Sequence, residues 1–132
     1  MTKAKKPYIP WMQRTEAARF SFIKSAIRKA SMRYPPKYEV LNAAKVGKRI
    51  NPKSGKMAEH YKCAACGQDS PASSVAVDHI LPIVDVTGFS GWGEVVERLF
   101  CPPEGLQVLC LECHKKKSQE ENAERRANKK SK

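Results

Sequence analysis

The sequence predicts a small α+β protein held together by a bound metal ion, and three observations lead to that class. The chain has 132 residues, 41% of them hydrophobic, with a mean hydropathy of −0.57, so it can form one modest core. Short strand-like runs stand beside helical patterns in its second half. Four of the five cysteines fall in two C-x2-C pairs, a spacing typical of metal ligands.

The first long element is expected to be a basic amphipathic helix. Apolar residues recur at helical spacing over about residues 15–34, and Pro35-Pro36 predicts the end of that helix. Basic side chains occupy the rest of its surface: Arg19, Lys24, Arg28 and Lys29.

A second, short helix is expected over residues 37–47, ending at Gly47. The turn signal at residues 51–55, NPKSG, lies between two short basic segments and favours a hairpin over residues 46–62. Residues 1–60 are therefore interpreted as a basic, mainly helical N-terminal extension.

The second half predicts a compact domain over residues 61–126, followed by a frayed basic tail over 127–132. Its expected elements are, in order, a strand at residues 74–77, a helix at 92–100, a strand at 106–109 and a helix from 110 to about 126. The apolar residues of the 92–100 helix, Trp92, Val95, Val96, Leu99 and Phe100, should all face inward.

Charge is distributed unevenly along the chain. The formal net charge is +12, composed of +13 over residues 1–62, −6 over 63–113 and +5 over 114–132. Basic arms around an acidic centre suit a polyanion, because each neutralised phosphate releases a counterion, and an acidic cluster repels phosphate unless a cation lies between them. The alternative is that these charges only solvate exposed faces.

The cysteine pairs are Cys63-x2-Cys66 and Cys110-x2-Cys113, separated by 43 residues. Four thiolates complete a tetrahedral shell for structural Zn²⁺, which would hold the fold and leave no position for a reacting water. Free or redox-active thiols are the alternative. The fifth cysteine, Cys101, is expected to be a small buried hydrophobe.

A second group of residues has side chains that could bind a metal ion and accept a proton. Asp78-His79 follows a strand-like run, and His114 comes immediately after an expected zinc ligand. A carboxylate and an imidazole can hold one divalent ion, while a second imidazole takes a proton from water. Phosphodiester hydrolysis needs that combination. Asp85 is a weaker candidate, with a solvated loop as the alternative.

The order of these motifs resembles the zinc-stapled branch of the HNH endonucleases, the ββα-metal or His-Me finger family, and is especially similar to small phage-encoded members. The resemblance covers about residues 61–121. It is carried by the two cysteine pairs, Asp78-His79-Ile80-x-Pro82, the Gly105-Leu106-Gln107-Val108-Leu109 segment and His114-x2-Lys117.

The resemblance implies a two-stranded ribbon and a helix that grip one Mg²⁺ or Mn²⁺ against DNA. It implies that His79 is the general base and that Asp78 and His114 are ligands of the catalytic ion. The family's middle residue is usually Asn and braces the base, whereas this chain has Gly105 there. A backbone carbonyl could orient His79 instead.

These features predict a metal-dependent DNA endonuclease that nicks or cuts through water attack. The alternatives are a non-catalytic zinc-binding DNA module with a degenerate site and, less favoured, a protein-interaction zinc module. DNA phosphates are expected to bind the basic N-terminal helix and the C-terminal helix. No segment predicts a membrane span or a signal peptide, so we expect a cytoplasmic protein of a bacterial or phage-infected cell.

Overall fold

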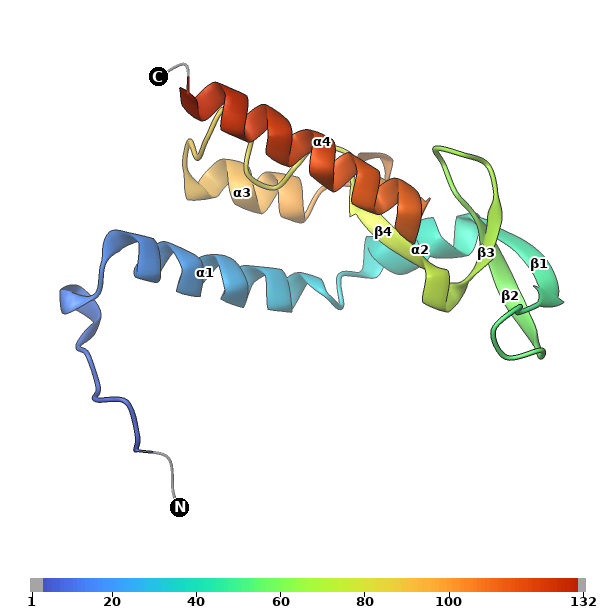
Figure 1. Ribbon diagram of the computed structural model, residues 1–132, viewed down its shortest axis with the longest axis horizontal. Helices are drawn as coiled ribbons and strands as arrows, with labels where there is room; N and C mark the ends of the chain where they lie inside the picture. Colours follow the sequence, from blue (N-terminus) through green and yellow to red (C-terminus); the bar gives the residue numbers. More distant parts are fainter. Residues whose placement is uncertain (1–3, 131–132) are drawn as a thin grey trace. The chain divides into compact units, whose positions relative to one another are not determined.

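The structure is a computed structural model that describes residues 4–130 (Figure 1). Contacts between Cα atoms divide the chain into an N-terminal unit, Met1–Met32, and a C-terminal unit, Arg33–Lys132. This boundary lies well before the one the sequence predicts after residue 60. The reason is strand pairing, because the hairpin within 46–62 belongs to the same sheet as a strand at Asp69–Pro71.

The N-terminal unit contains a short 3-10 helix, η1 (Trp11–Gln13), and the helix α1 (Glu16–Ser31). The Thr15 side chain caps α1 by accepting a hydrogen bond from the backbone N–H of Ala18 at 3.1 Å. The Trp11 ring meets the Phe22 ring edge-on, with centroids 5.4 Å apart, and this contact anchors η1 on α1.

The start of the C-terminal unit differs from the sequence prediction in two ways. Pro35 and Pro36 form the first turn of α2 (Pro35–Ala43) rather than only ending the previous helix, because a proline lacks the N–H that a first turn cannot use. Tyr34 is therefore not part of α1. Gly47 does not end a helix but lies in strand β1 (Lys45–Ile50), at a register shift where its φ of 121° creates a bulge.

The first sheet has the order β1-β2-β3, with β2 spanning Met57–Lys62 and β3 spanning Asp69–Pro71. Both pairings are antiparallel, and β1 is an edge strand. The hairpin that the turn signal favours is thus present as β1 and β2.

The second sheet is a two-stranded antiparallel ribbon of β4 (Val75–His79) and β5 (Leu106–Cys110), and α4 (Leu111–Lys130) follows β5 directly (Figure 1). The consecutive residues Val108, Leu109 and Cys110 are all buried. Neighbours on a strand point to opposite faces, so β5 is covered on both sides, and it contacts both α2 and α4.

The helix α3 (Trp92–Leu99) supplies the core residues Val95 and Leu99. The apolar residues of α3 do not all face inward as expected, because Val96 is 43% exposed. The ring of Phe100 meets that of Tyr34 edge-on, and the Tyr34 hydroxyl lies 2.9 Å from the carbonyl of Cys101.

The last helix continues to Lys130, beyond the expected end near residue 126, because the Asn128 side chain donates to the carbonyl of Val86 at 3.0 Å. The rest of the predicted tail, residues 131–132, lies outside the described residues. Among the helices of residues 4–130, none has the length and apolar character that crossing a membrane requires.

Candidate metal centre and candidate active site

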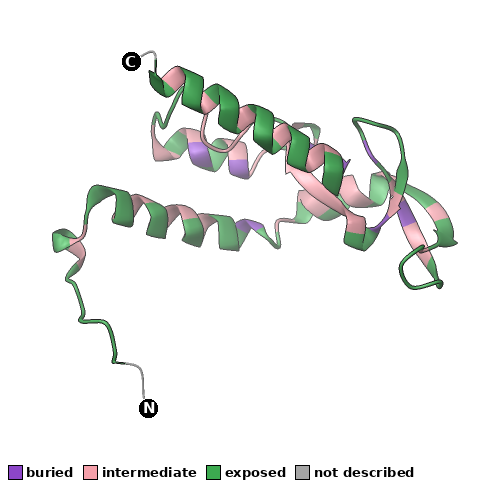
Figure 2. Ribbon diagram, viewed as in Figure 1, coloured by how far each residue is buried: buried purple, intermediate pink, exposed green. Residues whose placement is uncertain are grey.

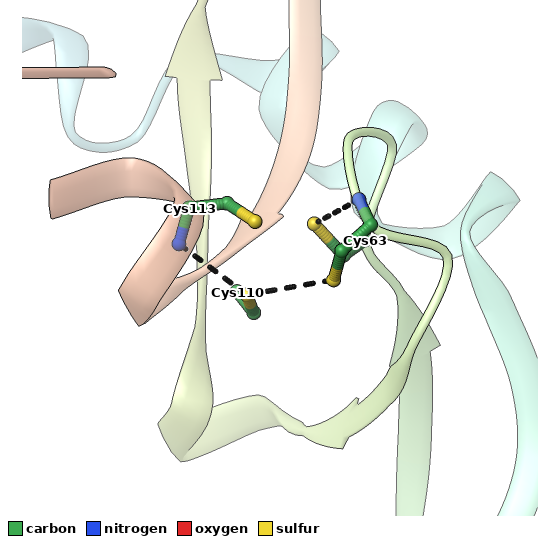
Figure 3. A group of neighbouring side chains, drawn as sticks. Cys63, Cys110 and Cys113 are labelled. Carbon is green, nitrogen blue, oxygen red and sulfur yellow. Dashed lines mark hydrogen bonds between the residues drawn. The ribbon is translucent and has the colours of Figure 1, made fainter. Parts of the chain in front are cut away.

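Four cysteines, Cys63, Cys66, Cys110 and Cys113, form a compact cluster whose sulfur atoms all lie within 4.8 Å of one another. Figure 3 shows the side chains of Cys63, Cys110 and Cys113 converging from a loop, the end of a strand and the first turn of a helix. The group could hold a metal ion such as zinc, as the sequence spacing predicts.

The local fold of each cysteine pair directs backbone N–H groups toward sulfur. The N–H of Cys66 points at Sγ of Cys63 at 3.5 Å, and the N–H of Cys113 points at Sγ of Cys110 at 3.4 Å. After the first pair, Gly67 turns the chain with a φ of 76°, a conformation that residues with a side chain rarely adopt. Such donors stabilise the negative sulfur that a metal ion requires.

The thiols differ in acidity. Burial raises the pKa of Cys63, but backbone N–H groups, that of Cys66 first, outweigh it and lower the pKa to about 6. The neighbouring Cys110 sulfur raises the pKa of Cys113 to about 12. The sulfur atoms are therefore close enough to influence one another's ionisation, as expected for four side chains that could share one metal ion.

Asp78 and His114 meet between the ribbon and α4. The Nε2 atom of His114 lies 3.7 Å from Oδ1 of Asp78, whose side chain is only 12% exposed. The other carboxylate oxygen of Asp78 accepts a hydrogen bond from Nε2 of Gln107 at 3.1 Å, because the two residues are paired across β4 and β5. A carboxylate oxygen and an imidazole nitrogen at this separation fit two ligands of one divalent ion.

Lys117 is already bound to the same carboxylate. Its Nζ atom lies 3.1 Å from Oδ2 of Asp78, 2.5 Å from Oε1 of Glu121 and 2.9 Å from the carbonyl oxygen of His79. Burial lowers the pKa of Lys117, but the bonds to Glu121 and Asp78 outweigh it and raise the pKa, so the ammonium stays charged.

The motif His114-x2-Lys117 in the sequence does not indicate what Lys117 contacts. In the structure, this side chain joins Asp78 to Glu121 one turn further along α4. Within the described residues, the cysteine quartet is the group of three or more His, Cys, Asp or Glu side chains close enough to share an ion. Asp78 and His114 form a pair, and Lys117, which contacts Asp78, also binds the carboxylate of Glu121.

His79 lies next to Asp78 but its ring approaches a different element. Its Nε2 atom lies 3.0 Å from the carbonyl oxygen of Leu99 at the end of α3. Strand β4 stays paired through its last residue, His79, so adjacent side chains leave the ribbon on different faces. Asp78 thereby contacts α4, while the His79 imidazole contacts the end of α3.

Gly105 stands where the resembling family usually has Asn, and the structure shows what fills the space. A Cβ atom added to Gly105 would lie 2.7 Å from Sγ of Cys101. The carbonyl of Gly105 accepts a hydrogen bond from the N–H of Ile80 at 2.9 Å, so this backbone still braces the residue after His79.

Comparison of the chain with protein-family models, with curated proteins and with solved structures finds no match. The side chains and their arrangement therefore carry the functional assignment on their own.

Asp85 belongs to a loop contact and not to the pair at Asp78. Hydrogen bonds from the backbone N–H and the hydroxyl of Thr87, together with Arg98 at 2.9 Å, lower the pKa of Asp85 to about 2. Arg98 also donates to the carbonyl of Pro82 at 3.0 Å. These contacts hold the loop between β4 and α3 in place.

Three features of the candidate site are not predicted from the sequence. Gln107 could have been found from the strand register, because it pairs with Asp78. The Leu99 carbonyl has no sequence signal, since every residue carries one. The Lys117–Glu121 pair has the spacing of neighbours on a helix, but only the fold places it beside Asp78.

Proposed function

We propose that this protein is a metal-dependent DNA endonuclease of the HNH type. The single observation that carries the proposal is the placement of the Asp78 carboxylate and the His114 imidazole 3.7 Å apart, between a two-stranded ribbon and the helix that follows it. The strongly basic chain, with a net charge of +12, supports DNA as the substrate.

In this proposal Asp78 and His114 would hold one Mg²⁺ or Mn²⁺. When bound, that ion would neutralise charge on the phosphate and on the departing 3′ oxygen. Gln107 orients the Asp78 carboxylate by donating to its Oδ2 atom. The cysteine quartet would hold a structural Zn²⁺ that joins the ribbon to α4 and takes no part in the chemistry.

His79 would act as the general base. An N–H at Nε2 that donates to the Leu99 carbonyl makes Nδ1 the basic nitrogen of the ring. That nitrogen would take the proton from the attacking water. Because Asp78 and His79 leave β4 on different faces, this role requires the water to lie at the end of the strand, within reach of both side chains. The Leu99 carbonyl thus supplies the orientation that the usual Asn gives in the resembling family.

Plasmid cleavage tests this proposal. Supercoiled DNA should be nicked or linearised with added Mg²⁺ or Mn²⁺, and not after EDTA treatment. His79→Ala should lower the rate by roughly 10²- to 10⁴-fold, because the base is lost while metal and DNA still bind. DNA affinity and zinc content of the variant serve as controls. Undiminished cleavage by His79→Ala, or no cleavage by the wild type with any divalent ion, would refute the assignment.

A second candidate is a DNA-binding zinc module without catalysis. The contact that favours it is the 3.1 Å ion pair between Lys117 and Asp78, which occupies one oxygen of the proposed metal ligand. Gly105, at the position where the resembling HNH family usually has Asn, also favours this non-catalytic candidate. This candidate predicts tight DNA binding, a bound zinc and no cleavage in the plasmid assay.

A further inference from the structure

The tip of the β1–β2 hairpin carries an exposed apolar pair. Ile50 is 64% exposed and Met57 is 61% exposed, and the two residues are direct partners across the antiparallel ladder. Directly paired residues project from the same face of a ribbon. The last residue pair before the turn therefore presents two adjacent aliphatic side chains to solvent.

Basic side chains are numerous along the hairpin that carries this pair. Residues 45–62 contain one acidic side chain, Glu59, and six basic ones, which are Lys45, Lys48, Arg49, Lys53, Lys56 and Lys62. Each of the six residues is exposed. The hairpin is thus strongly cationic while its tip is apolar, and this combination suits a surface that faces both phosphates and bases.

The tip is held by its own hydrogen bonds. The N–H of Asn51 donates to the carbonyl of Lys56, and the N–H of Gly55 donates to the carbonyl of Asn51, both at 2.8 Å. The Asn51 side chain accepts from the N–H of Lys53 at 3.0 Å. A turn closed in this way presents its side chains with little ordering cost on binding.

The base of the hairpin is anchored in the C-terminal unit. Strand β2 pairs with β3 on its other side, and the chain passes from Lys62 directly into the metal-ligand candidate Cys63. The N–H of Lys62 also donates to the carbonyl of Ala44 at 2.9 Å. Six residues of strand reach roughly 20 Å at about 3.3 Å per residue, so the tip can enter a groove while its base stays outside.

Protection of a sheet edge explains part of this composition. Lysines on an edge strand such as β1 discourage pairing with another chain. That function does not account for Ile50 and Met57, because exposed aliphatic residues at an edge promote association instead. A partner that accepts apolar side chains together with positive charge would account for both features.

We propose that the hairpin enters the minor groove of duplex DNA and inserts the Ile50–Met57 pair between base pairs. Proteins that bind this groove frequently place Ile, Met or similar side chains between base steps and kink the duplex by roughly 20–90°. The basic residues contact the flanking phosphates, and each contact releases a condensed counterion. The inference shares its DNA partner with the proposed function but does not rest on cleavage.

The test measures DNA bending and base unstacking in the His79→Ala background, without added divalent ions. A short duplex carries a fluorophore pair at its ends and 2-aminopurine as the unstacking probe. His79→Ala protein should bend this duplex and raise the 2-aminopurine signal. Adding Ile50→Thr and Met57→Thr, which keeps strand propensity, should abolish both signals and weaken binding less than about tenfold.

The matched control applies the same chemical change elsewhere. Ile9 and Met12 are 52% and 79% exposed in the N-terminal unit. The double variant Ile9→Thr, Met12→Thr should leave bending and unstacking unchanged. Lys53→Gln with Lys56→Gln should lower the slope of log K against log salt by about 0.9 for each phosphate that the protein no longer neutralises.

The possible results separate the two proposals. Bending that survives in the Ile50→Thr, Met57→Thr protein, or no bending by the parent protein, overturns the hairpin proposal. Absence of cleavage by the wild type refutes the nuclease assignment and leaves the bending result unaffected. Loss of bending in the Ile9→Thr, Met12→Thr control would also overturn the proposal, because it would show that side chains of the N-terminal unit bend the DNA.

Discussion

The ammonium group of Lys117 lies beside the Asp78 carboxylate, which is a proposed ligand of the catalytic ion. Its Nζ atom contacts Asp78 and Glu121 and also the carbonyl oxygen of His79. A divalent ion bound at Asp78 therefore competes with the ammonium, and the two cations repel each other at this short range. Lys117 also holds the backbone of the proposed base.

This competition predicts the effect of Lys117→Met. Removing the ammonium should lower the Mg²⁺ concentration needed for half-maximal cleavage, by roughly 3- to 10-fold, which corresponds to about 1 kcal/mol. A titration of plasmid cleavage with Mg²⁺ measures the change. Lys116→Met, which alters an exposed neighbour on the same helix, is the matched control and should leave the midpoint unchanged. A higher midpoint in Lys117→Met would contradict the competition.

The Cys101 side chain occupies the space beside Gly105. This contact predicts the result of introducing Asn at position 105. Gly105→Asn should lower the melting temperature, because its Cβ atom would lie 2.7 Å from Sγ of Cys101, and overpacking costs roughly 1–3 kcal/mol. Cys101→Ala alone should change stability little, yet it should recover much of the stability in the double variant. Melting curves of the four proteins measure this coupling. Additive effects would show that the two sites are independent.

At the scale of elements, apolar periodicity and the Cys spacing predict the parts whose signals are local. The ribbon strands and α3 are found within one or two residues of their bounds, since Leu99 and Leu109 belong to apolar runs. The turn signal predicts the hairpin of β1 and β2, but the first residues of β1 are expected to be helical, because the pairing of Lys45 and the bulge at Gly47 depend on the partner strand. Local pattern alone favours a helix there.

The helix α4 shows why part of the site cannot be read from the sequence. None of its residues, Leu111–Lys130, is buried, and Figure 2 shows it in the exposed and intermediate colours. Its inner face is polar: Arg125 donates to the carbonyl of Val84 at 2.8 Å, and Lys117 to that of His79. A helix held by bonds to loop carbonyls has no apolar stripe that a periodicity search could detect.

The helix α1 belongs to a unit of its own, so its contribution to DNA binding can be tested by removal. Residues 1–32 carry eight basic and one acidic side chain. Deleting them should weaken DNA binding and flatten the dependence of log K on log salt by about 0.9 for each phosphate left without its basic partner. Zinc content should stay at the level of the full chain, because the cysteine quartet lies in residues 33–132. An unchanged salt slope would exclude α1 from the DNA interface.

At the scale of the whole molecule, the cysteine quartet joins the two sheets. Cys63 follows β2 of the first sheet, whereas Cys110 ends β5 of the second. A two-stranded ribbon is marginal in water without further support. A metal ion at the quartet would therefore stabilise the ribbon that carries Asp78 and His79.

This arrangement predicts one tightly bound zinc per chain. Cys66→Ser should lose the metal and unfold the ribbon and α4, because metal binding to such a shell contributes folding free energy. Elemental analysis and circular dichroism measure both effects. Cys101→Ser serves as the control and should keep the metal, since Cys101 lies outside the quartet. Metal-free wild-type protein with the full helical signal would contradict the prediction.

Of the candidate site, the sequence predicts the identities of the ligands better than their surroundings. Four cysteines at C-x2-C spacing predict their own cluster, because each pair is local and only one long-range contact is needed. The closeness of Asp78 to His114 is what the resemblance to the HNH family implies, and the structure places the two side chains 3.7 Å apart. The Lys117 contact and the Leu99 carbonyl depend on the packing of α4 and α3, which no local pattern encodes.

The lengths of the loops predict an order of folding. The turn between β1 and β2 has only six residues, whereas 43 residues separate Cys66 from Cys110. Each doubling of loop length costs about 0.6 kcal/mol of closure entropy, so the longer loop closes roughly 2 kcal/mol less favourably. We expect the cationic hairpin to form early and Asp78 to meet His114 late. If the hairpin binds DNA as proposed, a newly made chain would bind DNA before its candidate active site has formed.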